Sequence, residues 1–208
     1  MIDAQLVAFV GVSVLLIVAP GPDMAVVTKN ALAHGRRGVA LTTSGIALAL
    51  IIWVSATAVG LSALLRTSGE VLFVLKIAGA LYLAYLGIRT LIESRARPAD
   101  LLAGMPAAPP AHSVFRQGFL SAISNPKLGV FFVTFLPQFV VPGEAVLPRL
   151  LELGLIFAVL GWAWLNAYGW FVTRLRAVIT APRVRQWMQR VTGVVLLGFG
   201  ARLALERV

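Results

Sequence analysis

The stretch QLVAFVGVSVLLIVAPGPDMAVVTKNALA, residues 5–33, decides the fold of this chain. An α-helix needs about 20 mainly apolar residues to cross the hydrocarbon core of a bilayer, and this stretch is long enough to do so. The run PGPD at residues 20–23 interrupts it, and proline cannot donate the backbone hydrogen bond that a continuous helix requires. We therefore expect a membrane-spanning helix that is broken near its middle.

The composition extends this expectation to the whole chain. Hydrophobic residues make up 59% of the 208 residues, and charged residues make up only 12%. Roughly a quarter of the residues of a water-soluble domain are charged, so much of the surface of this protein must face lipid. The apolar run at residues 6–19 lacks the basic start of a secretory signal peptide, and we expect it to be retained as a helix.

Five further apolar segments have the length of membrane spans. They cover residues 39–65, 71–91, 114–139, 153–172 and 187–205. The run NPK at residues 125–127 interrupts the fourth span of the chain, and residues 93–112 form a polar loop rich in proline and alanine. The sequence thus predicts an all-α integral membrane protein with six transmembrane helices in a single domain.

The basic residues alternate between the two sides of these spans. Three connections, the first, third and fifth, hold most of them: Lys29, Arg36, Arg37, Arg89, Arg95, Arg97, Arg116, Arg174, Arg176, Arg183, Arg185 and Arg190. The opposite side holds only Arg66, Arg149, Arg202 and Arg207. Because basic loops stay in the cytoplasm, we expect both termini to face the periplasm. The same scatter of short basic clusters argues against nucleic-acid binding, despite a net charge of +10.

Several classes of protein are excluded by what the sequence lacks. The chain has no cysteine, which excludes thiol redox chemistry, disulfides and thiolate metal sites. His34 and His112 lie in predicted loops without partner ligands, and the sequence has no HExxH motif, Ser–His arrangement or group of carboxylates. We expect neither an enzyme nor a metal or cofactor site.

The two interruptions occupy equivalent places if the chain consists of two units of three helices. In each unit a glycine lies eight or nine residues before the interrupting proline. Three crossings per unit invert the second unit relative to the first, so we predict inverted repeats at residues 1–92 and 113–208. Inverted repeats whose broken helices meet near the midplane are a transporter architecture. The alternative left open is that both prolines only kink packing helices.

Ionisable residues inside the predicted spans mark candidate functional positions. Asp23 lies at the first interruption, Lys127 at the second, and Lys76 within the third span. A charge at membrane depth costs several kcal/mol unless it is paired or hydrated, so such residues often mark substrate or ion pathways. Asp23 can accept hydrogen bonds from freed backbone N–H groups and exchange a proton with a water-filled cavity, while the lysines can neutralise it or attract a substrate carboxylate. A permanent Asp–Lys ion pair that only joins helices is the open alternative.

Three motifs occur in register along the chain. They are PGPD at residues 20–23 followed by Val26, Lys76 followed by Gly79-Ala80, Tyr82-Leu83 and Tyr85-Leu86-Gly87, and NPK at residues 125–127 followed by Phe131-Phe132 and LPQF at residues 136–139. Together these motifs resemble those of the LysE/RhtB family of bacterial amino-acid exporters, and the resemblance covers essentially the whole chain. It implies a bacterial inner-membrane secondary transporter that exports amino acids or closely related small zwitterions by proton antiport.

The resemblance, together with the charged residues inside the spans, also indicates a central site. The predicted substrate and ion pathway contains Pro20, Gly21, Pro22, Asp23, Lys76, Asn125, Pro126 and Lys127. The expected partners are an amino acid, protons and membrane lipids. Faces of small residues, such as Gly154, Ala158 and Gly161, allow close helix packing and are compatible with a homodimer. A channel or a noncatalytic membrane assembly subunit is the alternative function.

Overall fold

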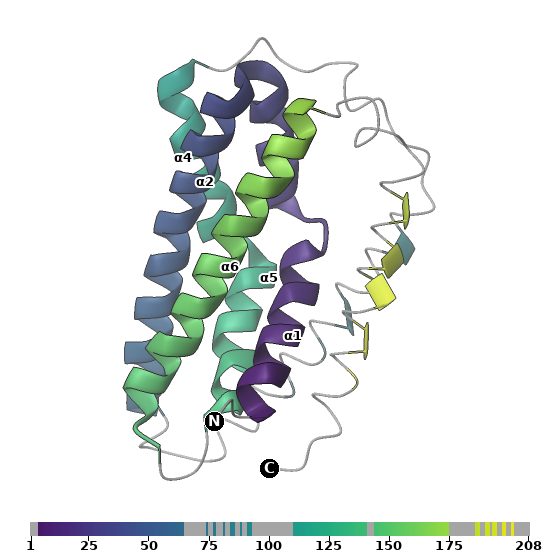
Figure 1. Cartoon of the computed structure of the whole chain (residues 1–208). Helices are drawn as coiled ribbons and strands as arrows, with labels where there is room; N and C mark the ends of the chain where they lie inside the picture. Colours follow the sequence, from purple (N-terminus) through teal and green to yellow (C-terminus); the bar gives the residue numbers. More distant parts are fainter. Residues whose placement is uncertain are drawn as a thin grey trace.

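The computed structural model describes residues 4–64, 110–140 and 144–174, with isolated residues between 74 and 92 and between 186 and 201. This described part is helical and contains no strand. Its elements are α1 (Ala4–Val18), α2 (Pro22–Leu64), α4 (Ala111–Ile123), α5 (Pro126–Val130), the π-helix η1 (Phe131–Phe135), the 3-10 helix η2 (Leu136–Phe139) and α6 (Val146–Arg174). The long helices run side by side in an elongated bundle (Figure 1).

Two of the described helices are long and apolar enough to cross a membrane, α2 over Pro22–Ser62 and α6 over Val146–Arg174. A third candidate span consists of His112–Ile123 and Pro126–Phe139, which bend by 45° at the break between them. These helices agree with the predicted helical membrane protein. The number of six spans stays a prediction, because the expected third and sixth spans lie outside the continuously described residues.

The helix α2 consists of two arms, because the chain reverses at Gly35. Gly35 has φ 58° and ψ −144°, a backbone conformation that favours glycine. Beyond it the second arm (residues 36–64) returns along the first arm (residues 22–34), and Asn30 Nδ2 donates to Thr42 Oγ1 at 2.9 Å. The reversal lies at the end of the bundle where α4 begins (Figure 1). The first predicted span therefore corresponds to α1 with the first arm, and the second predicted span to the second arm.

Glycines bring the helices into backbone contact. A Cβ atom at Gly45 of α2 would lie 2.1 Å from the carbonyl oxygen of Phe115 of α4, so only glycine permits this approach. On α6, a Cβ atom at Gly154 would lie 2.7 Å from Cγ1 of Val54. Lipid gives helices no hydrophobic drive to associate, and such close packing stabilises the bundle instead. Part of the small-residue face of α6 is therefore buried against α2 within one chain.

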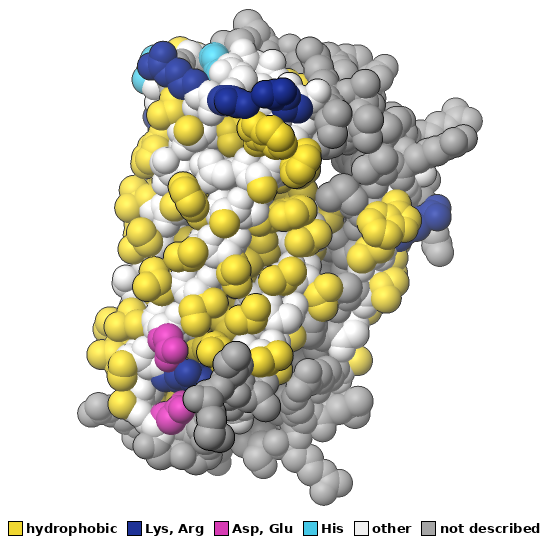
Figure 2. Space-filling model, viewed as in Figure 1, with side chains coloured by type: hydrophobic (Ala, Val, Ile, Leu, Met, Phe, Trp, Pro, Cys, Tyr) yellow, Lys and Arg dark blue, Asp and Glu magenta, His cyan; other side chains and the backbone are white. Residues whose placement is uncertain are grey.

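On the face that Figure 2 shows, apolar side chains cover most of the described surface of the bundle, and most of the charges lie near its two ends. Val59 and Val159 are 64% and 56% exposed, although both are large apolar residues. Arg36 directly follows the reversal of α2 at Gly35. At the opposite end, Arg149 pairs with Glu152 at 3.0 Å. An apolar wall with charged ends is the surface that a bilayer requires.

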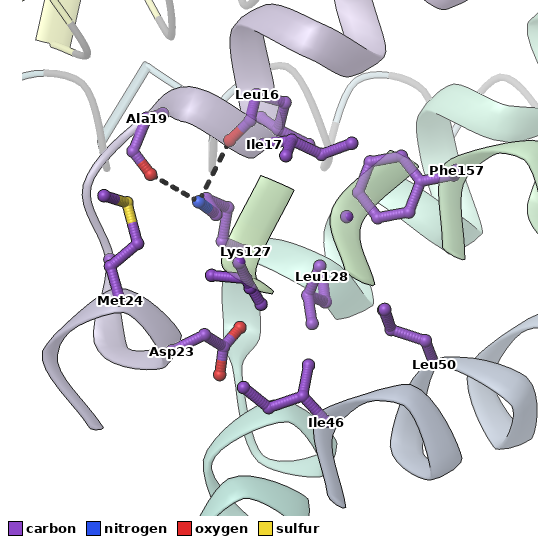
Figure 3. A pocket seen from close by; sticks show the side chains of 13 residues that line it. Leu16, Ile17, Ala19, Asp23, Met24, Ile46, Leu50, Lys127, Leu128 and Phe157 are labelled. Atoms are coloured by element: carbon purple, nitrogen blue, oxygen red, sulfur yellow. Dashed lines mark hydrogen bonds between the residues drawn. The ribbon is translucent and has the colours of Figure 1, made fainter. Parts of the chain in front are cut away.

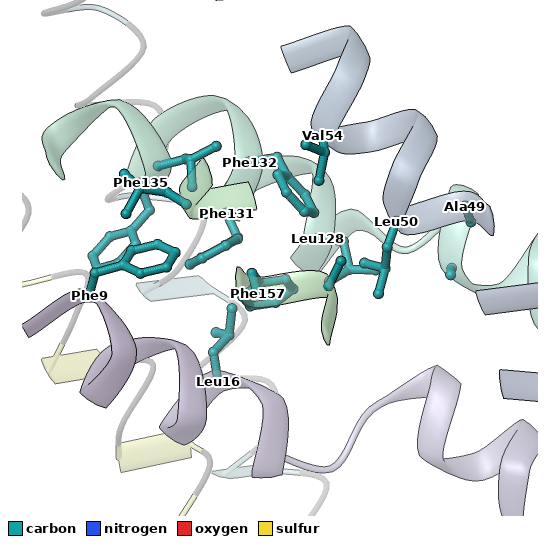
Figure 4. Close-up of a cluster of buried hydrophobic side chains, with 14 of the residues drawn as sticks. Phe9, Leu16, Ala49, Leu50, Val54, Leu128, Phe131, Phe132, Phe135 and Phe157 are labelled. Atoms are coloured by element: carbon teal, nitrogen blue, oxygen red, sulfur yellow. The ribbon is translucent and has the colours of Figure 1, made fainter. Parts of the chain in front are cut away.

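An aromatic cluster fills the core between α1, η1, η2 and α6 (Figure 4). It includes Phe9 of α1, and α1 begins at the end of the bundle opposite the reversal of α2 (Figure 1). The cluster comprises Phe9, Phe131, Phe132, Phe135, Phe139 and Phe157. The ring centroids of Phe131 and Phe157 are 4.3 Å apart, and the indole of Trp53 stacks on Phe132. Aromatic pairs at these distances add about 0.5–1.5 kcal/mol each beyond their buried area. The cluster therefore forms a tightly closed part of the bundle.

Candidate functional site

The first break separates α1 from α2 about halfway along the bundle (Figure 1). In an α-helix the carbonyl of residue 16 accepts a hydrogen bond from the N–H of residue 20, but Pro20 has no N–H. The helix α1 accordingly ends at Val18. The carbonyls of Leu16 and Ala19 are thereby directed into the break, where they accept hydrogen bonds from a side chain.

The second break lies between α4 and α5 and follows the same rule. Pro126 withholds the N–H that the carbonyl of Ala122 would otherwise accept. This carbonyl accepts instead from the backbone N of Asn125 at 3.2 Å and from Nε1 of Trp53 at 3.3 Å. The Asn125 side chain caps α5 by accepting from the backbone N of Lys127 at 3.1 Å. The open end of α4 is thus stabilised by a tryptophan from α2.

The carboxylate of Asp23 reaches from the first break to the second. Its Oδ1 accepts a hydrogen bond from Oγ of Ser121 at 2.6 Å, and its Oδ2 accepts from Nδ2 of Asn125 at 2.8 Å. Asp23 also lies in the first turn of α2, where the helix dipole favours a negative charge. Hydrogen bonds to an ionised group are roughly twice as strong as neutral ones. Side chains at the second break therefore bind the carboxylate that lies at the first break.

The ammonium of Lys127 reaches in the opposite direction. Its Nζ donates to the carbonyl oxygens of Leu16 and Ala19, both at 3.2 Å (Figure 3). These carbonyls lie at the C-terminal end of α1, where the helix dipole favours a cation. Gly21 leaves room for the ammonium, because a Cβ atom there would lie 3.3 Å from Nζ. The charged side chain of each break is thus hydrogen-bonded to groups of the other broken helix. These polar contacts join the two broken helices.

The structure brings together seven of the eight residues predicted for the pathway, because the two breaks that contain them contact each other. The eighth, Lys76, lies outside the described residues. The direct Asp–Lys ion pair that the sequence left open is not among the ion pairs of the described residues. Instead, the carboxylate of Asp23 binds side chains, and the ammonium of Lys127 binds backbone carbonyls.

Sequence reasoning missed three participants in this network. Ser121 lies one helical turn before Asn125, so a search for polar residues on the same helix face would have found it. The carbonyl of Leu16 follows from the position of Pro20, by counting four residues back. Trp53 had no such signal, because it comes from a separate helix and meets the break only through packing.

A pocket lies beside these charges, between both breaks, the second arm of α2 and α6 (Figure 3). The space among its lining residues is about 430 Å³, including the part that opens outward. Asp23 and Lys127 are its charged lining residues within the described part of the chain, and the remaining lining residues are apolar or glycine. That part of the chain also has no group of three side chains suited to a metal ion. The pocket therefore combines one positive and one negative group with an apolar wall.

The two sides of the pocket differ in character. Phe157 lines the pocket and also belongs to the aromatic cluster, which closes the bundle on that side. Toward the reversal of α2, polar side chains pair between helices instead. Oγ1 of Thr28 and the hydroxyl of Tyr168 are 2.8 Å apart, and Oγ1 of Thr43 donates to Oδ1 of Asn166 at 3.2 Å. Closed aromatic packing thus lies on one side of the charges and polar contacts lie on the other.

Broken helices that contact each other beside a binding pocket occur in secondary transporters. The chain belongs to the family of LysE type translocators, whose model matches residues 14–207. The resemblance inferred from the three sequence motifs is therefore confirmed.

Relatives of known name match over nearly their whole length. A homoserine/homoserine lactone efflux protein of Salmonella typhi is 30% identical over 200 residues, which is 96% of each chain. A leucine efflux protein of Klebsiella pneumoniae is 29% identical and covers 92% of this chain and 91% of its own. A membrane protein of Bacillus subtilis, YrhP, is 27% identical and covers 97% of this chain. The first two are efflux proteins rather than enzymes. No solved structure matches the chain.

Proposed function

We propose that this protein is a secondary transporter that exports amino acids, or closely related small zwitterions, across the inner membrane of a bacterium. The observation that carries this proposal is the pocket in which the carboxylate of Asp23 and the ammonium of Lys127 face an otherwise apolar wall of described residues. A zwitterion carries the same two charges and complements both. Membership of the translocator family and the named efflux relatives support the same function.

The arrangement of the charges explains how a zwitterion is bound away from water. A substrate carboxylate lies against Lys127, and the substrate ammonium lies near Asp23 or the carbonyls freed at the first break. Both protein charges have hydrogen-bond partners within the protein. Because the substrate brings no net charge, binding exchanges partners and leaves no charge unpaired. This matters because an unpaired charge at membrane depth is costly.

Transport follows from movement of the two predicted repeats, residues 1–92 and 113–208, against each other. The breaks lie where the repeats meet, so the pocket opens first to one side and then to the other. The aromatic cluster packs the bundle closed on one side of the pocket. That side faces the periplasm in the orientation that we propose. A proton moves inward in exchange for the amino acid, and Asp23 carries it. Such coupling requires that protonation of Asp23 favours one of the two conformations.

The orientation in the membrane rests on the basic residues. The end at which α2 reverses faces the cytoplasm, together with the loop at residues 93–112, and both termini face the periplasm. The protein is a multi-pass membrane protein in this arrangement. A homodimer would have to form through surfaces other than the buried positions Gly154 and Ala158 on α6.

An export assay in intact bacteria tests the proposal. Cells that express the protein are loaded with amino acids as dipeptides, and the release of each amino acid is compared with that from cells carrying an empty vector. We expect faster release of at least one amino acid. The variant Glu152→Gln, altered at an exposed carboxylate far from the pocket, serves as a matched control and should export normally. Unchanged release of every amino acid would contradict the proposal.

Reconstitution into proteoliposomes separates a carrier from a channel or an assembly subunit. A carrier gives flux that saturates with substrate concentration and responds to an imposed proton gradient. A channel gives flux that rises linearly with concentration. A noncatalytic subunit gives no flux above that of empty liposomes.

A further inference from the structure

The ammonium of Lys127 occupies a place that the backbone creates independently of it. Pro20 removes the helical donor of the Leu16 carbonyl, and the carbonyl of Ala19 points at the same spot. Both oxygens lie 3.2 Å from Nζ at the C-terminal end of a helix, which attracts cations. Gly21 leaves this spot accessible from the pocket. Any primary ammonium of similar size fits here.

An α-amino acid carries such an ammonium next to a carboxylate. A primary ammonium has three N–H donors, as the head group of lysine has. When the substrate ammonium takes the two carbonyls, the released Nζ of Lys127 remains at the pocket wall, where it meets the substrate carboxylate. The carboxylate of Asp23 keeps its bonds to Ser121 and Asn125 throughout. Every charged group thus has hydrogen-bond partners both before and after binding.

Compounds that carry only one of the two groups cannot achieve this balance. An amine without a carboxylate displaces Lys127 from the carbonyls and leaves its ammonium without a hydrogen-bond acceptor. A carboxylic acid without an ammonium withdraws Lys127 from the carbonyls and leaves them without a donor. An uncompensated buried charge and an unpaired buried carbonyl are both unfavourable. The site therefore discriminates against both kinds of compound.

We propose that the carbonyls of Leu16 and Ala19 are the subsite for the α-ammonium of the substrate, and that Lys127 occupies it while the pocket is empty. On binding, Lys127 moves to the substrate carboxylate. This inference rests on the proposed export of amino acids and assigns the roles within that site. It makes Lys127 an internal substitute for the substrate ammonium.

Binding to the purified full-length protein in lipid nanodiscs tests this assignment. The probes are leucine, 3-methylbutylamine, which is leucine without its carboxylate, and 4-methylpentanoate, which is leucine without its ammonium. Leucine is chosen because Ile46, Leu50 and Phe157 make the pocket wall apolar. The wild-type protein should bind leucine at least about tenfold more tightly than either truncated probe.

The variant Lys127→Met gives the decisive comparison, because it keeps the length of the side chain and leaves the carbonyls vacant. Its affinity for leucine should fall at least about tenfold, and its affinity for 3-methylbutylamine should rise by a similar factor. Lys127→Gln is the matched control, since it removes the same charge but its amide still donates to the carbonyls. It should gain less amine affinity than Lys127→Met. Thermal melting checks that each variant is folded, and Lys127→Ala replaces the methionine variant if that one does not fold.

Three outcomes would overturn the assignment. One is a folded Lys127→Met that binds the amine no better than the wild-type protein does. Another is a gain in affinity for the amine in Lys127→Gln that equals the gain in Lys127→Met. That result would show that loss of the lysine charge alone causes the gain. The third is a wild-type protein that binds the amine as tightly as leucine. Export of an amino acid from cells despite any of these results would leave the proposed function standing, whereas absence of export would contradict that function itself.

Discussion

Single residues at the two breaks act through the hydrogen bonds that they withhold as well as through the charges that they carry. Pro20 frees a carbonyl that Lys127 binds, and Pro126 frees a carbonyl that Trp53 binds. In a bilayer an unsatisfied backbone group costs several kcal/mol, because water is not available to pair with it. The lysine and the tryptophan therefore stabilise the broken helices in addition to any part in transport.

Asp23→Asn is the residue substitution that tests proton coupling. The amide keeps the size of the carboxylate and can still accept from Ser121, but it loses the second acceptor oxygen that binds Asn125. We expect insertion into the membrane, a loss of stability of about 1–3 kcal/mol, and transport that no longer responds to a pH gradient. The measurement is amino-acid flux in proteoliposomes at several external pH values.

The control for this substitution is Glu152→Gln, since Glu152 pairs with Arg149 near the start of α6, away from both breaks. That variant should keep the pH dependence of the wild-type protein. If Asp23→Asn also kept it, Asp23 would not be the proton carrier, and the coupling group would have to be sought elsewhere.

Among the helices, α4 and α5 show how a break differs from a simple bend. The two segments meet at 45°, and the carbonyl of Ala122 accepts from Trp53 and from the backbone N of Asn125, because Pro126 has no N–H to offer it. Pro126→Ala supplies the missing N–H and allows the helix to run on through Asn125. We expect this variant to insert normally but to transport about tenfold more slowly, because the pocket loses the local geometry around Lys127. Initial rates of export check this, and full activity would favour the account in which proline only kinks a packing helix.

Two glycines on α6 form a matched pair for a second test. A Cβ atom at Gly161 would lie 3.7 Å from Cδ1 of Leu50, an ordinary contact, whereas a Cβ atom at Gly154 would lie 2.7 Å from Val54. Gly161→Ala therefore folds and adds a methyl group to the pocket wall. We expect it to slow export of leucine relative to alanine by about tenfold, since one methylene is worth about 1–3 kcal/mol in such a pocket.

Gly154→Ala should instead lower stability by about 1–3 kcal/mol, because overpacking forces α2 and α6 apart. Its melting temperature should fall while the ratio of leucine to alanine export stays unchanged. A change of that ratio in Gly154→Ala, or none in Gly161→Ala, would show that Gly161 does not limit substrate size.

Over the whole molecule, the sequence predicted those features that depend on local chemistry. The PGPD and NPK runs marked both breaks, because the effect of a proline on its helix does not depend on distant residues. The hydrogen bonds by which Asp23 and Lys127 each reach the other break were not predictable in the same way. Lys127 binds a carbonyl 111 residues away, and the lengths of the spans do not determine how their faces meet. The π-helix at residues 131–135 likewise has no marker in its sequence, FFVTF.

The orientation of the whole bundle gives the last prediction, and the chain is well suited to test it because it contains no cysteine. Arg36→Cys places a thiol at the reversal of α2, and Glu152→Cys places one at the opposite end, near the start of α6.

A membrane-impermeant maleimide added to intact cells should label Glu152→Cys only. In inside-out vesicles it should label Arg36→Cys only. Val159→Cys, on the exposed apolar surface of α6, should react in neither case, because lipid excludes both water and the reagent. Labelling of both end positions from one side would show that the bundle does not cross the membrane between them. The reverse pattern would place the basic end of the bundle, together with the predicted loop at residues 93–112, outside the cytoplasm.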